Sequence, residues 1–573
     1  MFFEVTTLFK IRSCEKQKRI LIAGFLTLLI ILLCTPLLFD GVISGDDYHF
    51  HLSRIRNIAD GLKEGHFPVK IHPSSINSYG YGNGLFYPNF FLYLPAVLVL
   101  LGVELLLSYK IFAVVLTATL TLSTYFSSRY IYKSRYAAVM TTLFFTTAQT
   151  VITNMYYRMA VGETLAMVFI PMVIAGLYNV VHEDFSKPLI LICAFLGLVY
   201  SHTITLFLSV VVAGFYLLIN IRKLFFSTGL SSGYGWYIIG KLSLCAACVL
   251  LLSAGYWMPM LEQFLIGQFG LSTPWTYLSE NSLSLMRLLR PSRPGLGLAL
   301  IISAAAVLIY VISKRKPELH STFRHPVRHM STGFVLALLS TDLFFWSAFD
   351  MTFFNFIQFP WRLLPYSAAF LAFGTGGCLC HIFKENKKRL FSFLLSVLLV
   401  CLVMMGPLFG LRAETEPLPE DICNARWSVG FGEWLPLDTD TDALIHPSTV
   451  FTDTDEEIAV SSRQGNSLVF TVTQEYADAE YFDVPLLFYK GYSATITDEN
   501  GHTENLSVTH SGNNLVRLIS SGKEGRISVT YSGTMIQRLS YGLNSISAVL
   551  AAAYIITRIF SRKKTQVRKT KAH

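Results

Sequence analysis

Long apolar segments recur along this chain, and they limit its fold more than any other feature. Between residues 20 and 410, and again near the C-terminus, runs of about 17 to 24 apolar residues alternate with short polar stretches. Each run is long enough to cross about 30 Å of hydrocarbon as a helix. Because 52% of the residues are hydrophobic and 14% are charged, the composition is typical of a membrane protein. The sequence therefore predicts a mainly α-helical bundle in lipid.

Basic residues are grouped between the apolar segments. A formal net charge of +9 would suggest nucleic acid as a partner of a soluble chain, but clusters of Lys and Arg beside apolar runs follow the positive-inside rule. We therefore expect no nucleic-acid partner. The basic residues in 10–19 place the N-terminus in the cytoplasm. Residues 20–39 form an uncleaved anchor, since this run is too long for a signal peptide and no small-residue cleavage site follows it.

The apolar run at residues 85–102 is interrupted by Pro88 and Pro95. If this run crossed the membrane, the basic residues Arg129, Lys133 and Arg135 would lie outside. If it lies on or re-enters the outer surface, they lie inside, as the charge rule favours. We therefore expect residues 85–102 to stay at the outer surface.

This choice gives a consistent topology of about 12 membrane helices. Besides residues 20–39, the expected spans are 109–128, 137–154, 164–182, 188–202, 203–221, 239–258, 297–313, 332–349, 363–383, 390–411 and 541–560. Residues 1–411 form the main membrane domain, and its first outer loop, 40–108, carries juxtamembrane helices, one of them at 48–62. The basic tail, 561–573, is cytoplasmic.

Residues 412–540 differ in composition from the rest of the chain. Polar and β-branched residues alternate at 468–472, 492–497, 515–519 and 527–531, as in half-buried strands. Residues 499–502 contain an Asn-Gly pair, which is typical of a tight hairpin turn. We expect a β-sandwich of about 130 residues on the outer face.

An ionisable cluster, SGDDYHFH at residues 44–51, follows the first span. Charged groups beside a membrane helix are costly and commonly functional. If a helix begins at Tyr48, Asp47 and His51 lie at positions i and i+4 on one face, with Asp46 close by. These three side chains could bind a divalent cation such as Mg²⁺ or Mn²⁺, or could supply a base with an orienting partner. The alternative is a solvated helix start in which the aspartates only cap the helix.

Further polar residues lie between later apolar segments. Arg158 and Glu163 form one charged pair, and Arg362 follows residues 358–361 at the start of another span. Arginine beside aromatic residues at a membrane surface suits a lipid phosphate, although Trp361 and Arg362 could simply anchor the helix at the interface. His202 could be a ligand or base, or a packed turn residue.

All these polar residues, together with Glu262, fall on the outer side in the topology derived from charge. Their convergence predicts an extracytoplasmic active site whose substrate is anchored in the membrane. The residues alone do not decide whether the site binds a divalent cation.

Several segments, taken in order, also resemble a known family. They are residues 47–54 (DYHFHLSR), 65–73, 79–87 (YGYGNGLFY), 158–171 (RMAVGETLAMVFIP), 201–203, 358–362 (QFPWR) and 431–436. The set resembles the polytopic bacterial proteins labelled "6-pyruvoyl-tetrahydropterin synthase-related", which are relatives of YfhO-type proteins within the GT-C glycosyltransferase superfamily. The pterin label is discounted, since a pterin synthase needs a soluble metal site.

The resemblance implies a GT-C fold, a polyprenyl-phosphate sugar as donor and inversion at the anomeric carbon. By position, Asp47 matches the family's loop carboxylate and His51 its histidine, and the family's other recurrent polar positions are matched by Arg158, Glu163 and Arg362. Our own hypothesis is that four residues serve catalysis, namely Asp47, Asp46, His51 and Glu163, and that five bind the substrate, namely Arg158, Arg362, His202, Tyr87 and Trp361. Two positions depart from the family pattern, because Lys70 replaces an expected arginine and Met159 an expected glycine.

The sequence thus predicts a glycosyltransferase of the bacterial cytoplasmic membrane. It would move a sugar from a polyprenyl-phosphate carrier to an envelope polymer or glycolipid, and a divalent cation is its only expected cofactor. The alternative is a non-catalytic transporter or assembly protein for lipid-linked envelope precursors. The sequence contains no internal repeat, which disfavours a transporter built from two related halves.

Overall fold

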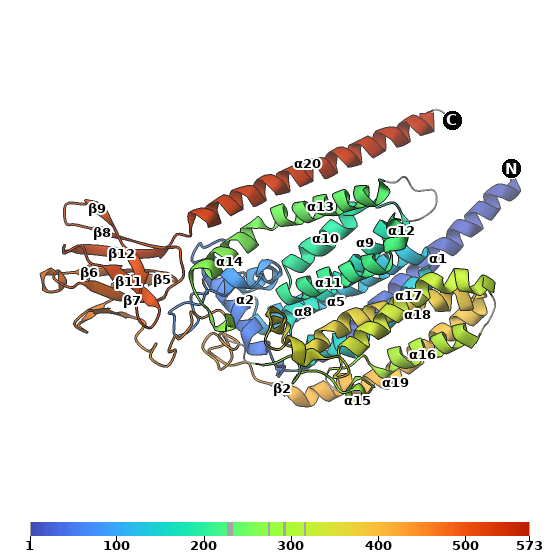
Figure 1. Cartoon of the computed structure of the whole chain (residues 1–573), viewed down its shortest axis with the longest axis horizontal. Coiled ribbons are helices and arrows are strands. Elements are labelled where there is room, and N and C mark those ends of the chain that lie inside the picture. Colours follow the sequence, from blue (N-terminus) through green and yellow to red (C-terminus); the bar gives the residue numbers. More distant parts are fainter. Residues whose placement is uncertain (1, 226–232, 273–275, 290–293, 314–316, 572–573) are drawn as a thin grey trace. The chain divides into compact units, whose positions relative to one another are not determined.

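The computed structural model describes the chain except for residues 1, 226–232, 273–275, 290–293, 314–316 and 572–573 (Figure 1). The chain divides into two compact units. Unit 1 consists of Met1–His51, Val103–Ser232 and Pro274–Glu420; unit 2 consists of Leu52–Gly102, Gly233–Thr273 and Asp421–His573. The expected β region therefore belongs to a unit that also contains two earlier parts of the chain.

Unit 1 is a bundle of helices. Its main helices are α1 (Phe2–Leu33), α5 (Leu105–Tyr132), α6 (Arg135–Thr146), α7 (Gln149–Ile152), α8 (Val161–Met167), α9 (Ile170–His182), α10 (Pro188–Val199), α11 (Thr203–Ile219), α12 (Ile221–Phe225), α15 (Leu285–Leu289), α16 (Leu298–Ser313), α17 (Pro317–Leu339), α18 (Leu364–Ile382) and α19 (Asn386–Gly410). Single turns are η1 (Thr35–Leu38), η3 (Thr153–Tyr157), η5 (Trp346–Phe349), η6 (Phe353–Ile357), η7 (Pro360–Leu363) and η8 (Leu411–Glu414). A small pair of strands, β1 (Val42–Ile43) and β2 (Thr415–Glu416), completes the unit.

The core of unit 1 is built around α18, which is buried over most of its length. This helix packs against α17, α6 and α16. Glycines permit the close approach: a side chain at Gly376 would collide with Thr141 of α6, and one at Gly374 would collide with Met330 of α17. Small residues at helix contacts are the usual means of close packing in membrane proteins. The helix that follows Arg362 is thus held firmly in place.

Several predicted spans of unit 1 are wrong in their extent, and two of them show the cause. Within the span expected at 332–349, the helix α17 already ends at Leu339. There the hydroxyl of Ser340 donates to the Ala337 carbonyl, 2.6 Å away. The span expected at 137–154 is interrupted after α6, and the backbone N–H of Gln149 donates to Leu296 at 3.2 Å instead of continuing the helix. Hydroxyl side chains compete for backbone groups at such ends.

Unit 2 begins within α2 (Tyr48–Lys63), which confirms the helix expected at 48–62. Its other helices are α3 (Asn83–Phe86), α4 (Tyr93–Leu100), α13 (Tyr234–Leu252), α14 (Ala254–Ile266) and α20 (Met535–Lys571), with turns η2 (Phe90–Leu92), η4 (Gly270–Ser272) and η9 (Gln474–Tyr476). Since α4 rises only about 12 Å, it is too short to cross a membrane. The helix α20 begins six residues before the expected 541, because the Thr534 hydroxyl accepts the N–H of Gln537 at 3.0 Å.

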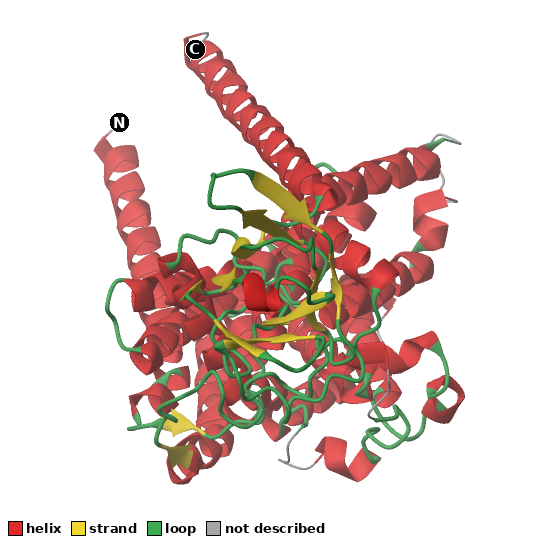
Figure 2. Ribbon diagram, turned by 90° about the vertical axis from the view of Figure 1, so that its left-hand side faces the viewer, coloured by secondary structure: helices red, strands yellow, loops and turns green. Residues whose placement is uncertain are grey.

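The expected β-sandwich is confirmed (Figure 2). Its strands are β3 (Thr449–Thr452), β4 (Glu457–Ala459), β5 (Ser462–Gln464), β6 (Ser467–Val472), β7 (Tyr481–Leu487), β8 (Tyr492–Thr497), β9 (Thr503–Leu506), β10 (Val508–His510), β11 (Leu515–Ile519) and β12 (Gly525–Tyr531). They form two five-stranded sheets, with the orders β10-β11-β7-β3-β4 and β5-β6-β12-β8-β9. The predicted Asn-Gly turn joins β8 to β9, where Thr497 pairs with Thr503.

Alternating burial explains why the two sheets pack face to face. In β6 and β8 every second side chain is buried. These side chains meet residues of the other sheet, such as Phe482, in one hydrophobic core. The period of two is the pattern expected of strands with one covered face.

Apolar helices of membrane-crossing length occur in both units. Among the described residues, six helical segments are long and apolar enough to cross a membrane: Leu105–Tyr132, Val161–His182, Tyr234–Leu252, Pro360–Ile382, Asn386–Glu414 and Met535–Thr557. Four more apolar helices are shorter, namely Phe90–Leu100, Pro188–Val199, Thr203–Ile219 and Leu298–Ser313. The chain is a mainly helical membrane protein with a C-terminal β-sheet region, as the composition predicted.

Candidate active site

Backbone hydrogen bonds fix the loop that carries the two aspartates. The strand β1 pairs with β2, and the N–H of Ser44 then donates to Glu414 at 2.7 Å. Beyond it, the N–H of Asp47 donates to the Arg158 carbonyl at 2.8 Å. Only glycine fits at position 45, since a Cβ there would lie 2.8 Å from the Tyr156 carbonyl oxygen. The loop is therefore attached directly to the segment that contains Arg158.

The segment before Arg158 departs from regular α-helix. The helix α7 continues into the π-helical turn η3, and the N–H of Arg158 donates to the Thr153 carbonyl, five residues earlier, at 2.8 Å. Met159 then has a φ of 51°, a conformation that side chains other than glycine seldom adopt. Such π-helical turns and unusual backbone angles are frequent at functional sites. Here they end one helix and start α8 at Val161, which places Arg158 and Glu163 side by side.

Glu163 joins two arginines that are far apart in the sequence. One carboxylate oxygen of Glu163 lies 2.8 Å from Nη1 of Arg158, and the other lies 2.9 Å from Nε of Arg362. Glu163 and Arg362 are buried, and Arg158 keeps only 12% of its side chain exposed. Buried charges of this kind are retained only when they are paired and hydrogen-bonded. We refer to Asp47, Arg158, Glu163 and Arg362 as the charged cluster.

Each arginine of the cluster also binds an amide oxygen from four residues earlier. Arg158 donates to Oδ1 of Asn154, and Arg362 donates to Oε1 of Gln358 at 2.9 Å. Nη1 of Arg362 also donates to the Ile357 carbonyl at 2.6 Å. Neither Asn154 nor Gln358 was among the site residues predicted from the sequence. Their i, i+4 spacing to the arginines was the available signal.

Aromatic rings cover the guanidinium groups. The rings of Phe359 and Trp361 stack with centroids 4.8 Å apart. The Cζ of Arg158 lies 4.5 Å from the Trp361 ring, and that of Arg362 lies 4.9 Å from the Phe359 ring. These distances fit cation–π contacts, which gain strength as water is excluded. The predicted residue Trp361 thus contacts the charged cluster through Arg158.

Asp47 lies at the edge of the cluster. Its Oδ2 is 4.0 Å from Nη2 of Arg158, and 37% of its side chain is exposed. Burial raises the pKa of Asp47 to about 6, although Arg158 acts in the opposite direction; Glu163 and Asp46 raise it further. Burial lowers the pKa of Arg158, but the carboxylates of Glu163 and Asp47 raise it above its ordinary value. Asp47 is therefore the group of the cluster poised to exchange a proton near neutral pH.

The other predicted residues have different surroundings. The side chain of Asp46 is exposed, and His51 is buried in the first turns of α2 with its ring 5.1 Å from that of Phe50. His202 caps α11, where its Nδ1 lies 2.8 Å from the Thr205 hydroxyl. His202 is also close enough to interact electrostatically with Glu163.

Two expected site residues belong to unit 2. The ring of Tyr87 lies 4.1 Å from Cζ of Arg54, and Arg54 donates to Asn89 at 2.8 Å. Glu262 pairs with Lys490 at 3.2 Å and accepts a hydrogen bond from Thr534. Both residues take part in contacts within unit 2.

The expected metal set is not assembled. No group of three or more His, Cys, Asp or Glu side chains in the described part of the chain is placed to hold a metal ion. Asp46, Asp47 and His51 are near one another in sequence, but they do not form such a group. The divalent cation stays a prediction, and we derive no step through it.

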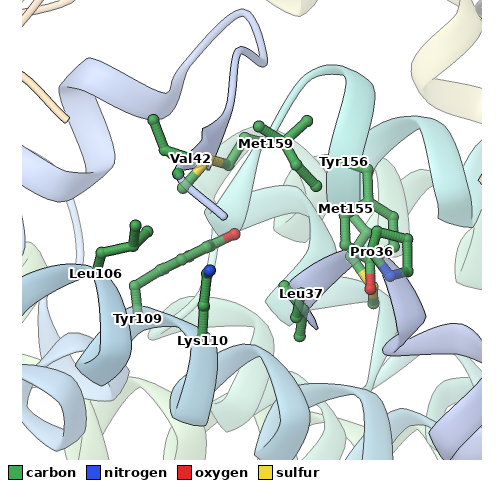
Figure 3. A pocket seen from close by; sticks show the side chains of 11 residues that line it. Pro36, Leu37, Val42, Leu106, Tyr109, Lys110, Met155, Tyr156 and Met159 are labelled. Atoms are coloured by element: carbon green, nitrogen blue, oxygen red, sulfur yellow. The ribbon is translucent and has the colours of Figure 1, made fainter. Parts of the chain in front are cut away.

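A narrow apolar pocket adjoins the segment that carries Arg158 (Figure 3). Pro36, Leu37, Val42, Leu106, Tyr109, Lys110, Met155, Tyr156 and Met159 line it, with Gly41 and Ile43. The amine of Lys110 donates to the Phe39 carbonyl at 2.8 Å. The free space is about 20 Å³, enough for about one water molecule.

The fold and the site together define a polytopic membrane protein with a buried arginine–carboxylate cluster next to an aspartate of raised pKa. The chain belongs to a family described as "Family of unknown function (DUF6541)", whose model matches residues 10–320. An uncharacterized protein of Lactococcus lactis subsp. cremoris (strain MG1363) is 24% identical over 234 residues, which cover 40% of this chain and 37% of that protein. The chain thus spans well under half the length of this relative.

Three solved structures are similar to this chain at low sequence identity. Arabinofuranosyltransferase AftD from Mycobacteria matches with a TM-score of 0.42 and 14% identity, covering 68% of this chain and 27% of that one. Archaeal oligosaccharyltransferase AglB from Archaeoglobus fulgidus, in complex with an inhibitory peptide and a dolichol-phosphate, matches with a TM-score of 0.37 and 14% identity. This match covers 72% of this chain and 57% of that one. ArnT from Cupriavidus metallidurans, bound to undecaprenyl phosphate, matches with a TM-score of 0.35 and 11% identity, and the match covers 65% of this chain and 62% of that one.

The resemblance to YfhO-type and pterin-synthase-related proteins is not supported by these comparisons, and the family that the chain does match is DUF6541.

Proposed function

We propose that this protein is a membrane glycosyltransferase that moves a sugar from a polyprenyl-phosphate carrier to a hydroxyl of a cell-envelope acceptor. The observation that carries the proposal is the charged cluster: Glu163 links Arg158 to Arg362, and Asp47 lies 4.0 Å from Arg158. A cation pair suited to a phosphate thus stands beside a carboxylate suited to accept a proton.

Asp47 is the proposed base. As the acceptor oxygen attacks the anomeric carbon, its proton passes to Asp47, and the bond between that carbon and the phosphate oxygen breaks. The bonding electrons leave with the lipid phosphate. Attack opposite to the leaving group inverts the anomeric carbon. A base whose pKa is raised to about 6 by burial is ionised at neutral pH and holds a proton more readily than a solvated aspartate.

Arg158 and Arg362 are the proposed phosphate ligands, and Glu163 is a positioning residue because both of its oxygens contact guanidinium groups. Once Asp47 has taken the proton, two cations face the single charge of Glu163. One unbalanced positive charge then remains for the departing phosphate. Fixed charges that match the charge developed during reaction are a main source of catalysis.

The direct test is transfer by the purified full-length protein in detergent, with a radiolabelled polyprenyl-phosphate sugar and an envelope glycan fraction as acceptor. We expect Asp47→Asn to reduce transfer at least about 100-fold, as is usual for loss of a general base. The matched control is Asp40→Asn, since Asp40 is an exposed aspartate of the same loop.

Unchanged transfer by the Asp47→Asn protein would overturn the catalytic assignment. The rival function, a transporter of lipid-linked precursors, gives a different result: the wild-type protein would move labelled lipid between the leaflets of a proteoliposome without transferring sugar.

A further inference from the structure

Unit 2 contains a polar pocket that the proposed reaction does not use. The pocket has a volume of about 240 Å³. Its lining includes His66 and Lys70 from the segment after α2, Asn466 and Tyr531 from the β-sandwich, and Gln537 and Tyr541 from α20. Pockets for drug-sized molecules are about 300–1,000 Å³, so this one suits a smaller group.

Lys70 gives the pocket a buried cation. Its side chain is 8% exposed, and its amine donates to the Gly255 carbonyl at 3.3 Å. The amine also lies 5.6 Å from the ring of Tyr541. Among the described residues, no carboxylate forms an ion pair with Lys70. Burial lowers the pKa of Lys70 to about 8, which leaves it charged at neutral pH. Buried charges are normally paired, so this cation lacks an anion.

The pocket also contains unsatisfied hydrogen-bonding groups. Oδ1 of Asn466, whose side chain is 5% exposed, and Nε2 of His66 have no partner among the described residues. The Asn466 amide nitrogen is already used, since it donates to the Ile71 carbonyl at 3.1 Å. Buried acceptors and donors are almost always satisfied in folded proteins. These atoms therefore indicate a ligand that offers both donors and acceptors.

Aromatic side chains and a hydrogen-bonded chain complete the lining. Nε2 of Gln537 donates to the Tyr541 hydroxyl at 2.8 Å, and the Tyr531 hydroxyl donates to Oε1 of Gln537 at 3.2 Å. Tyrosine combines an apolar ring with a polar end. Hydroxyl and amide groups around aromatic rings suit a molecule with many hydroxyls and an apolar face.

From these features we infer that the pocket binds one sugar unit that carries an acidic group, either a carboxylate or a phosphate. The acidic group would pair with Lys70, and the ring hydroxyls would bind Asn466, His66 and Gln537. This inference goes beyond the proposed function, because binding here requires no transfer. We further infer that this sugar is part of the acceptor, and this step rests on the proposed function.

The inference can be tested by isothermal titration of the purified full-length protein with glucuronate, glucose 6-phosphate, glucose and inorganic phosphate. We expect at least one of the two acidic sugars to bind at least about 10-fold more tightly than either glucose or phosphate. Which of the two binds better would identify the acidic group. Lys70→Gln should weaken acidic-sugar binding at least about 10-fold, whereas Lys523→Gln, at an exposed lysine paired with Glu504, should leave it unchanged.

Asn466→Asp provides a second variant that nearly preserves shape. It adds a negative charge to the lining of the pocket that would hold the acidic group, so acidic sugars should bind less tightly while glucose is less affected. The inference is overturned if no acidic sugar binds, if glucose or phosphate binds as tightly as both acidic sugars, or if Lys70→Gln leaves their binding intact. The Asp47→Asn protein should bind acidic sugars like the wild type, so that loss of transfer and loss of this site can be told apart.

Discussion

At the scale of single residues, the two carboxylates of the charged cluster have unequal surroundings. Both oxygens of Glu163 contact guanidinium groups. Asp47 is only 4.0 Å from Arg158, keeps 37% of its side chain exposed, and has its pKa raised to about 6 by burial. Two carboxylates in unequal environments can take different roles, one fixed in charge and one exchanging protons.

This difference predicts how transfer depends on pH. Because Asp47 must be ionised to act as a base, kcat/KM should fall as the pH drops below about 6. Glu163→Gln removes a negative charge that raises the pKa of Asp47, so the acid limb of the variant should move to lower pH. This role would be contradicted if kcat/KM of the wild type fell only near pH 3.8, the ordinary pKa of an aspartate, or if the fall moved to higher pH in the variant.

At the scale of elements, Glu163 joins α8 to the turn η7 that starts α18. Its partner Arg362 lies 199 residues further along the chain, and Arg362 is in turn held by η6 through the carbonyl of Ile357. Removing one member of a buried ion pair leaves an uncompensated charge in a poorly solvating environment, which is far more costly than losing an exposed pair.

Glu163→Ala should therefore destabilise the protein by about 3–5 kcal/mol. Thermal unfolding in detergent measures the change. The matched control is Glu385→Ala, since Glu385 is 67% exposed and pairs with an exposed lysine; its loss should cost about 1 kcal/mol or less. Equal melting temperatures for the two variants would show that the buried bridge does not support the packing of α8 and α18.

The elements that the sequence predicted well are those set by local periodicity. The strand expected at 492–497 has the bounds of β8, because alternation and an adjacent Asn-Gly turn specify both register and end. Hydropathy alone failed where helices end within apolar sequence, as after Leu339, since side-chain hydroxyls decide those ends.

The candidate site was predictable from the sequence only in part. The identities of Arg158, Glu163 and Arg362 could be read from polar residues beside apolar spans. That one carboxylate bridges both arginines could not, because this contact depends on how α18 packs. The φ of 51° at Met159 was signalled only by the family's glycine at that position.

At the scale of the whole molecule, the proposal requires the charged cluster to face the side of the membrane where envelope polymers are assembled. Within unit 1, Asp40 precedes the cluster, and Lys133 follows the long helix α5. The positive-inside rule places these two positions on opposite sides of the membrane.

Cysteine labelling in intact cells tests this topology. Lys133→Cys replaces a side chain that is 60% exposed, and it should resist a membrane-impermeant thiol reagent. Asp40→Cys, at an exposed position, should react readily. Labelling is compared with that of the wild-type protein, which contains native cysteines. Labelling of the Lys133→Cys protein above the wild-type level without permeabilisation would reverse the proposed orientation.

The most direct test of glycosyl transfer by the charged cluster is the sugar composition of envelope glycans in cells that lack the protein. We expect that one polymer loses one sugar, and that wild-type protein restores it while the Asp47→Asn protein, present at the same level, does not. Full restoration by the Asp47→Asn protein, or an unchanged glycan composition in the cells lacking the protein, would contradict it.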